Sequence, residues 1–218
     1  MAFYFPEFPN EFLAGLALLP LEDGNFHIGF IYQNELENKI KICHLCWHFK
    51  LKNEEFNDPK YYCEEVNLNY LNKKFLIASF QNISDLNDSN IPYGFRIPIE
   101  TYDKENIYVG NVKGEGLTCA TFILTVFEKN GYKILNRESW KLREDDSNWQ
   151  NFIIKHLAVT PGVSPDHLES AKQMIGSVVR FRPDEVFSCA VVDDVTKWDI
   201  DFSEAIKMAN EIKKCLAS

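Results

Sequence analysis

The 218-residue sequence lacks an excess of positive charge, a long apolar run and a regular set of cysteines. Its formal net charge of -9 gives no broad attraction to phosphate backbones or anionic membranes, so we expect no nucleic-acid partner and no membrane insertion. No apolar stretch approaches the roughly 20 residues that cross a bilayer. The opening MAFYFPEFPNEF has no basic segment of the kind found in secretory signals, which favours the cytoplasm.

The six cysteines are too sparse and irregular for a disulfide scaffold, and a reducing compartment would keep them as thiols. Internal repeats, low-complexity tracts and long linkers are also missing. A hydrophobic content of 45% is enough to bury a sizeable core. We therefore expect one soluble domain, or one domain with a helical extension, and no cofactor.

A metal site has to be considered at KICHLCWHFKL, which holds two cysteines and two histidines. Cys43 and Cys46 have the C-x-x-C spacing of zinc sites, but no second pair follows at a comparable spacing. If this run is a strand, alternation places His44, Cys46 and His48 on one face and Cys43 on the other. The expected state is metal-free, and zinc at residues 43–48 remains an alternative for measurement.

The hydrophobic pattern predicts a sheet in the first half of the chain and helices in the second. Strands are expected at 15–20, 26–32 and 39–51, the last two forming an antiparallel hairpin around QNELEN. Two further short strands are expected at 75–80 and 93–99. Helices are expected at 118–131, 145–157, 165–179, 184–192 and 202–216, with 184–192 also compatible with a strand.

Cys119 stands at the start of the apolar run TCATFILTVFEKNG. With Thr118 as the N-cap, the unpaired N–H groups and the positive helix end favour an anion there, so the thiol is expected to ionise readily. The same N–H groups could receive the oxyanion formed when a thiolate attacks a carbonyl. Gly114 and Gly116 are expected to let the backbone approach a substrate. The alternative is that Cys119 is a small buried hydrophobe.

A nucleophilic cysteine needs a base, and the predicted hairpin carries two histidines. If the turn centres between residues 35 and 36, His27 and His44 face one another with Cβ atoms about 5 Å apart. If the turn centre lies one residue later, His27 pairs with Cys46 instead, still on the same face. His156 and His167 are interpreted as exposed or capping residues.

FHIGFIY, then IKICHLCWHF, then LTCATFILTVFEKNG together resemble the circularly permuted NlpC-type papain-like superfamily, in particular its lecithin:retinol acyltransferase-like branch. The resemblance implies an α+β, papain-like fold with an antiparallel sheet packed on the helix that bears the nucleophile. It spans roughly residues 13–131, so we expect a catalytic core at 1–138 and a helical extension at 139–218 packed on it.

By this resemblance His27 is the general base, His44 the ring that orients it, and Cys119 the nucleophile that forms a thioester. His48 is the alternative third member. Thr118 stands where acyltransferase members often have Asn, so a lipid substrate does not follow from the resemblance.

The expected function is that of a cysteine-dependent hydrolase or acyltransferase acting on an amide, isopeptide or ester bond of a peptide or small acyl substrate. Tyr32, Trp47 and Trp140 are candidates for the pocket walls. The alternative function is a non-catalytic papain-like module that binds a protein partner.

Overall fold

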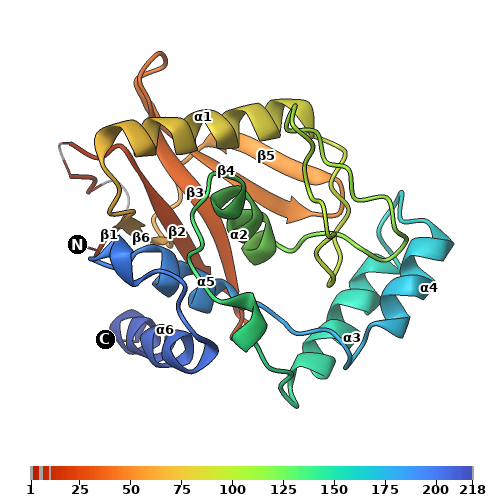
Figure 1. The fold of residues 1–218 in the computed structure, drawn as a ribbon. Coiled ribbons are helices and arrows are strands. Elements are labelled where there is room, and N and C mark those ends of the chain that lie inside the picture. The colour runs from red at the N-terminus through yellow and green to blue at the C-terminus, as the bar shows by residue number, and fades with distance from the viewer. Residues whose placement is uncertain (1, 5–6, 10, 218) are drawn as a thin grey trace.

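The computed structural model describes residues 2–4, 7–9 and 11–217 of the chain (Figure 1). Within these ranges the protein is α+β, with six helices and a six-stranded antiparallel sheet of order β1-β6-β2-β3-β4-β5. The strands are β1 (Ala2–Tyr4), β2 (Ala14–Pro20), β3 (Phe26–Asn34), β4 (Lys39–Trp47), β5 (Lys50–Glu55) and β6 (Tyr62–Glu65). The helices are α1 (Tyr70–Leu86), α2 (Cys119–Lys129), α3 (Asp146–Leu157), α4 (Pro165–Gln173), α5 (Pro183–Ala190) and α6 (Phe202–Leu216).

The two faces of the sheet bury two separate sets of apolar side chains, as strand alternation requires. On β3 and β4, Phe30 and Cys43 belong to the main core, whereas Ile31 and Ile42 belong to a smaller cluster on the opposite face. Helix α2 packs on β3 and β4 from the main-core side, and α5 packs on β2 and β3 (Figure 1). The nucleophile candidate therefore sits on a helix that covers the centre of the sheet.

The C-terminal helices share this main core. Leu157 of α3 and Phe187 of α5 are fully buried in the same cluster as Phe30. Helices α3 and α5 thus pack into the same core as the sheet and α2. No helix in the described part of the chain combines the length and apolar character needed to span a bilayer.

Two of the predicted strands are wrong. Residues 75–80 lie inside α1, where Leu76, Ile77, Phe80 and Ile83 are buried at helical spacing while Phe75 is 70% exposed. Residues 93–99 form an irregular extended segment that makes only isolated bridges to residues 115–117. The apolar runs themselves were too short to distinguish a strand from part of a helix.

The predicted strand 39–51 is two strands. It breaks after Trp47, because Phe49 takes a left-handed conformation with φ 56° and the chain reverses into β5. The predicted helices at 145–157, 184–192 and 202–216 are present within two residues of their bounds, and the helix begun at Ser164-Pro165 ends early, at Gln173.

Candidate active site

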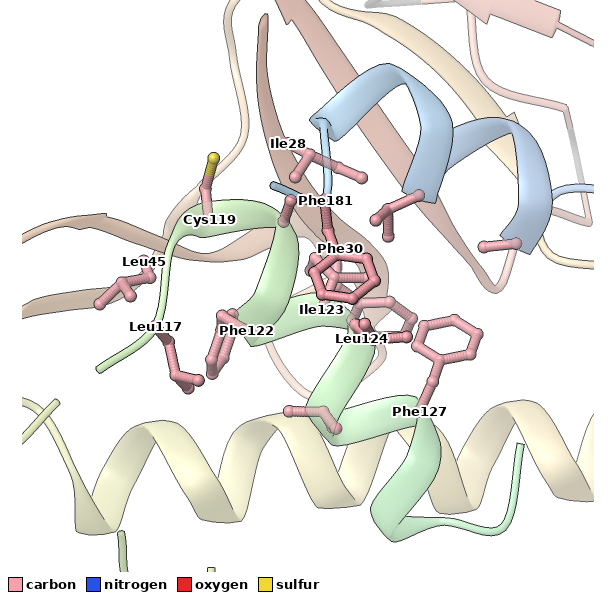
Figure 2. Packing of buried hydrophobic residues seen from close by; sticks show 14 of the residues in the cluster. Ile28, Phe30, Leu45, Leu117, Cys119, Phe122, Ile123, Leu124, Phe127 and Phe181 are labelled. Carbon is pink, nitrogen blue, oxygen red and sulfur yellow. The ribbon is translucent and has the colours of Figure 1, made fainter. Parts of the chain in front are cut away.

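Cys119 is the first residue of α2, and a reciprocal capping box sets its position. The Thr118 hydroxyl accepts a hydrogen bond from the Thr121 N–H at 3.2 Å, and the Thr121 hydroxyl accepts one from the Thr118 N–H at 2.7 Å. The predicted N-cap at Thr118 is confirmed, as is the left-handed Gly131 that follows the helix with φ 82°. Figure 2 shows the Cys119 sulfur at the start of the helix, directed away from the packed rings of Phe122 and Phe127.

The expectation that this thiol ionises readily is wrong, because burial dominates at this position. Cys119 is 7% exposed, and burial raises its pKa above the ordinary value. Hydrogen bonds from the N–H groups of Ile28, Ala120 and Cys119 itself, together with the charge of Arg180, offset only part of that effect. The helix start does supply N–H groups to the sulfur, but the loss of hydration around the buried thiolate outweighs them.

His27 and His44 are in direct contact, though not in the register expected first. Strand β3 pairs with β4 so that Phe30 faces Cys43, which is the alternative register, with His27 in line with Cys46. The rings of His27 and His44 meet diagonally instead, with Nε2 of His27 2.8 Å from Nδ1 of His44. The turn occupies residues 35–38, one residue later than the predicted centre.

A carboxylate extends this pair into a chain of three groups, here called the histidine relay (His27, His44 and Glu54). Nε2 of His44 lies 3.2 Å from Oε1 of Glu54. Burial alone would raise the pKa of Glu54, but hydrogen bonds from Lys52 and His44 outweigh it and hold the pKa below its usual value. Glu54 is therefore an acceptor.

The acceptor fixes where the protons sit in the relay. His44 donates its Nε2–H to Glu54, which leaves Nδ1 of His44 to accept from Nε2–H of His27. The remaining ring nitrogen of His27, Nδ1, then carries a free lone pair. Burial, with a smaller contribution from His44, lowers the pKa of His27 to about 3, so the ring is neutral at pH 7.

His27 of the relay and Cys119 line one pocket of about 210 Å³, here called the Cys119 pocket. His27, Cys46, Thr118, Cys119, Trp149 and Arg180 are among its lining residues. Alternation places His44 on the same face as Ile42, opposite to α2, and a Cβ on Gly29 would lie 3.1 Å from the His44 Cβ. The two sides meet at the start of β3, where His27 lines the pocket. Among the described residues, no hydrogen bond joins the Cys119 sulfur to either ring.

His48 lies outside this arrangement, so the alternative third member is wrong. It stands in the turn after β4, where Nδ1 accepts the Tyr93 N–H at 3.2 Å and the ring packs on His167. His167 is itself buried and links the Tyr93 carbonyl to the Gly114 N–H, rather than being exposed or capping. His156 is on the exposed side of α3, near the Phe152 carbonyl.

The two glycines before Cys119 have packing roles rather than the expected role beside a substrate. A Cβ on Gly116 would lie 2.3 Å from the Pro92 carbonyl oxygen, and one on Gly114 would lie 2.8 Å from Ser170. Of the expected aromatic walls, Trp47 lines the Cys119 pocket, whereas Tyr32 hydrogen-bonds Asn53 and Trp140 packs between Phe181 and Phe202.

Two functional candidates were missed from the sequence, Glu54 and Arg180, whereas Cys46 was considered only as a zinc ligand and as a partner of His27. Cys46 Sγ lies 3.3 Å from Nε2 of His44, and burial raises the pKa of its thiol to about 11. Alternation had put Cys46 on the His44 face, but Glu54 comes from the next strand and Arg180 from the segment before α5, which no local spacing indicates.

The atoms of His44, Cys46 and Glu54 could also hold a metal ion, since one ligand atom from each lies within 4.8 Å of the others. This differs from the set considered in the sequence, because Cys43 is fully buried on the other face and His48 is in a turn. No known family model, curated protein or solved structure matches this chain, so the fold class and the geometry of this site are the basis for its function.

Proposed function

We propose that the protein is a cysteine-dependent hydrolase or acyltransferase of the permuted papain-like type, acting on an amide, isopeptide or ester bond through a thioester. One observation carries the proposal: Cys119 begins α2 in the same pocket that receives His27, and His27 is oriented by His44 and Glu54. A thiol, a neutral imidazole and an orienting acceptor are the parts that nucleophilic catalysis requires.

In the proposed reaction, Nδ1 of His27 accepts the thiol proton as the Cys119 sulfur attacks the substrate carbonyl. The new oxyanion is held by N–H groups at the start of α2, among them those of Cys119 and Ala120. His27 then gives the proton to the leaving amine or alcohol, which leaves the acyl group on sulfur. A water or acceptor molecule, deprotonated by the same ring, cleaves the thioester and restores the thiol.

Cys119 and His27 are both neutral before attack, because burial disfavours the thiolate and the imidazolium. Proton transfer is therefore coupled to attack on the substrate. Catalytic hydrogen bonds are often long before substrate binds and shorten in the substrate complex, so the proposal does not require a hydrogen bond between Cys119 and His27 at this stage. The negative Glu54 at the far end of the relay stabilises the imidazolium that forms during attack.

Trapping of an acyl-enzyme with p-nitrophenyl acetate tests the proposal. We expect acetylation of Cys119, located by peptide mass spectrometry, with a burst of p-nitrophenol. The variant His27→Gln should slow this step about 10²- to 10⁴-fold, the usual range for a general base. The exposed Cys215 serves as the internal control, since its acetylation should not respond to His27.

Two results would contradict the assignment. If Cys46 is acetylated in place of Cys119, the thiol next to His44 is the nucleophile and the roles assigned above fail. If no cysteine reacts faster than Cys215, the site is not catalytic, and a non-catalytic module that binds a protein partner becomes the better interpretation.

A second candidate function, binding of a zinc-like metal ion, has its own observation. The distances from His44 Nε2 to Cys46 Sγ (3.3 Å) and to Glu54 Oε1 (3.2 Å) approach the ligand separations of about 3.3–3.6 Å in tetrahedral zinc sites. A metal on Nε2 of His44 would move the proton of that ring to Nδ1. His27 would then carry its proton on Nδ1, so this nitrogen would have no lone pair to accept the Cys119 proton.

Metal binding and catalysis are therefore exclusive in this site. Titration with Co²⁺ should give thiolate-to-cobalt absorbance that Cys46→Ser abolishes, and it should block acetylation of Cys119. Cobalt absorbance without any effect on acetylation would separate the two functions, and no absorbance would eliminate this candidate.

A further inference from the structure

Arg180 is a buried cation for which the described part of the chain supplies no acidic partner. It is 9% exposed and lines the Cys119 pocket, and its charge acts on the Cys119 thiol. Its guanidinium lies 3.8 Å over the ring of Trp149, and its one side-chain hydrogen bond among the described residues goes to Asn25 Oδ1 at 2.9 Å. Burial lowers its pKa to about 10, so it stays charged at pH 7.

Carboxylates near Arg180 form ion pairs with two other arginines. Arg143 pairs with Asp146 and Glu185, and Arg182 pairs with Asp145 and Asp146. The charges of both arginines and of Asp146 act on Arg180, yet Arg180 itself forms no ion pair in the described residues. An unpaired buried charge is costly, and most buried charges in proteins are paired.

The pocket itself offers only one carboxylate among its described lining residues, that of Asp23. Both of its oxygens accept hydrogen bonds from Asn25, at 3.0 and 2.8 Å, so Asp23 reaches Arg180 only through Asn25. Apolar side chains such as Phe152 and Phe181 also line the pocket. The guanidinium is therefore positioned to receive an anion from outside the protein, beside the thiol.

We infer that Arg180 binds a carboxylate of the substrate, so that the acyl donor is one that carries a carboxylate close to the bond that is cleaved. This inference rests on the proposed function, since it uses the same pocket and the same Cys119. Guanidinium and carboxylate form charge-assisted, often bidentate hydrogen bonds. The pocket of about 210 Å³ is smaller than the roughly 300–1,000 Å³ of sites for drug-sized ligands, so the part bound here is small. A terminal carboxylate of a peptide and an acidic side chain share this chemistry.

Two alkylating reagents of nearly equal size test the inference. Iodoacetate carries a carboxylate next to the carbon that the sulfur attacks, and iodoacetamide carries a neutral amide; in both, an S–C bond forms and iodide leaves. The measured quantity is the ratio of the iodoacetate rate to the iodoacetamide rate at Cys119, divided by the same ratio at the exposed Cys215. Peptide mass spectrometry gives both rates from one sample.

We expect this normalised ratio to be about 10 to 100 in the wild type, the range for a hydrogen bond to a charged group. Arg180→Met should bring it to about 1, and Arg180→Lys should retain part of it. Removing the charge also slows both reagents at Cys119, since the thiolate loses a nearby cation, but the ratio cancels that effect. Binding of a substrate carboxylate is contradicted if the wild-type ratio is near 1, or if Arg180→Met leaves it unchanged.

The outcomes distinguish this inference from the proposed function. Acetylation of Cys119 that depends on His27, together with a ratio near 1, would support the proposed enzymatic function and contradict binding of a substrate carboxylate by Arg180. A high ratio without acetylation would support anion binding by Arg180 and contradict the proposed enzymatic function. Because the wild-type ratio alone can overturn the inference, it remains testable if Arg180→Met does not fold.

Discussion

The capping box at the start of α2 allows a prediction whose size follows from the structure. Thr118 and Thr121 are 7% and 2% exposed, and each hydroxyl accepts the other residue's N–H. Replacing Thr118 by Val keeps the shape of the side chain and removes the acceptor. The Thr121 N–H is then buried without a partner, which costs about 1–2 kcal/mol in the free energy of unfolding, in line with the loss of an N-cap.

Two further substitutions separate the hydrogen bond from packing. Thr118→Ser keeps the hydroxyl and loses a buried methyl group, for a cost of about 0.8 kcal/mol. Thr118→Ala loses both, and the two losses together cost about 2–3 kcal/mol. For a chain of 218 residues, each kcal/mol lowers the melting temperature by about 2–4 °C, so the Ala variant should melt roughly 4–12 °C below the wild type.

Urea unfolding followed by tryptophan fluorescence measures the three free energies, and acetylation of Cys119 measures the catalytic effect. The expected order of stability is wild type, then Ser, then Val, then Ala. A Val variant as stable as the wild type would show that the capping box does not hold the start of α2. Some other contact would then have to hold Cys119 in place.

Four other perturbations have expected outcomes. Glu54→Gln should slow acetylation of Cys119 by at least about tenfold with little change in melting temperature, since it removes the charged acceptor of the relay. The rate of Cys119 alkylation by iodoacetamide should keep rising above pH 9, because burial raises the thiol pKa; a plateau below pH 8 would refute this interpretation. Gly29→Ala should destabilise the protein by about 1–3 kcal/mol, because the new Cβ would lie 2.6 Å from Ile42 Cδ1, and adding Ile42→Val should recover part of the loss in urea unfolding. Dialysis against a chelator after exposure to Zn²⁺ should restore acetylation in the wild type, while Cys46→Ser should show no zinc inhibition to reverse.

The sequence was most informative where a local signal decides the structure. Short apolar runs predicted β2 and β3, and cap residues predicted the starts of α2 and α4 at Thr118 and Ser164. These signals act over a few residues, so no long-range contact is needed to interpret them. The short strand Tyr62–Glu65 was missed because half of it is acidic and its partners lie far away in the chain.

The parts of the site that depend on register could be predicted only in part. Alternation alone places His44 and Cys46 on one face, but the register set by the turn decides whether His27 shares that face and which residue lies opposite it. The break of 39–51 at Phe49 could not be foreseen, because a phenylalanine in the left-handed region is rare and no glycine marks the turn. That break is what brings Glu54 back beside His44 and moves His48 away.

His27 and His44 lie on one face of the sheet, whereas Cys119 belongs to a helix that covers the other face. Of the two relay histidines, only His27, near the start of β3, lines the Cys119 pocket, so in the proposed mechanism the proton passes through a single ring nitrogen. Since Glu54 fixes the tautomer through His44, that nitrogen holds a lone pair before any substrate binds. In the proposed mechanism, burial keeps the Cys119 thiol protonated until an acyl donor binds, and the Arg180 charge in the same pocket would favour donors that carry a negative charge. Selectivity and the suppression of unwanted thiol chemistry then have one physical origin, which is the low dielectric of the pocket.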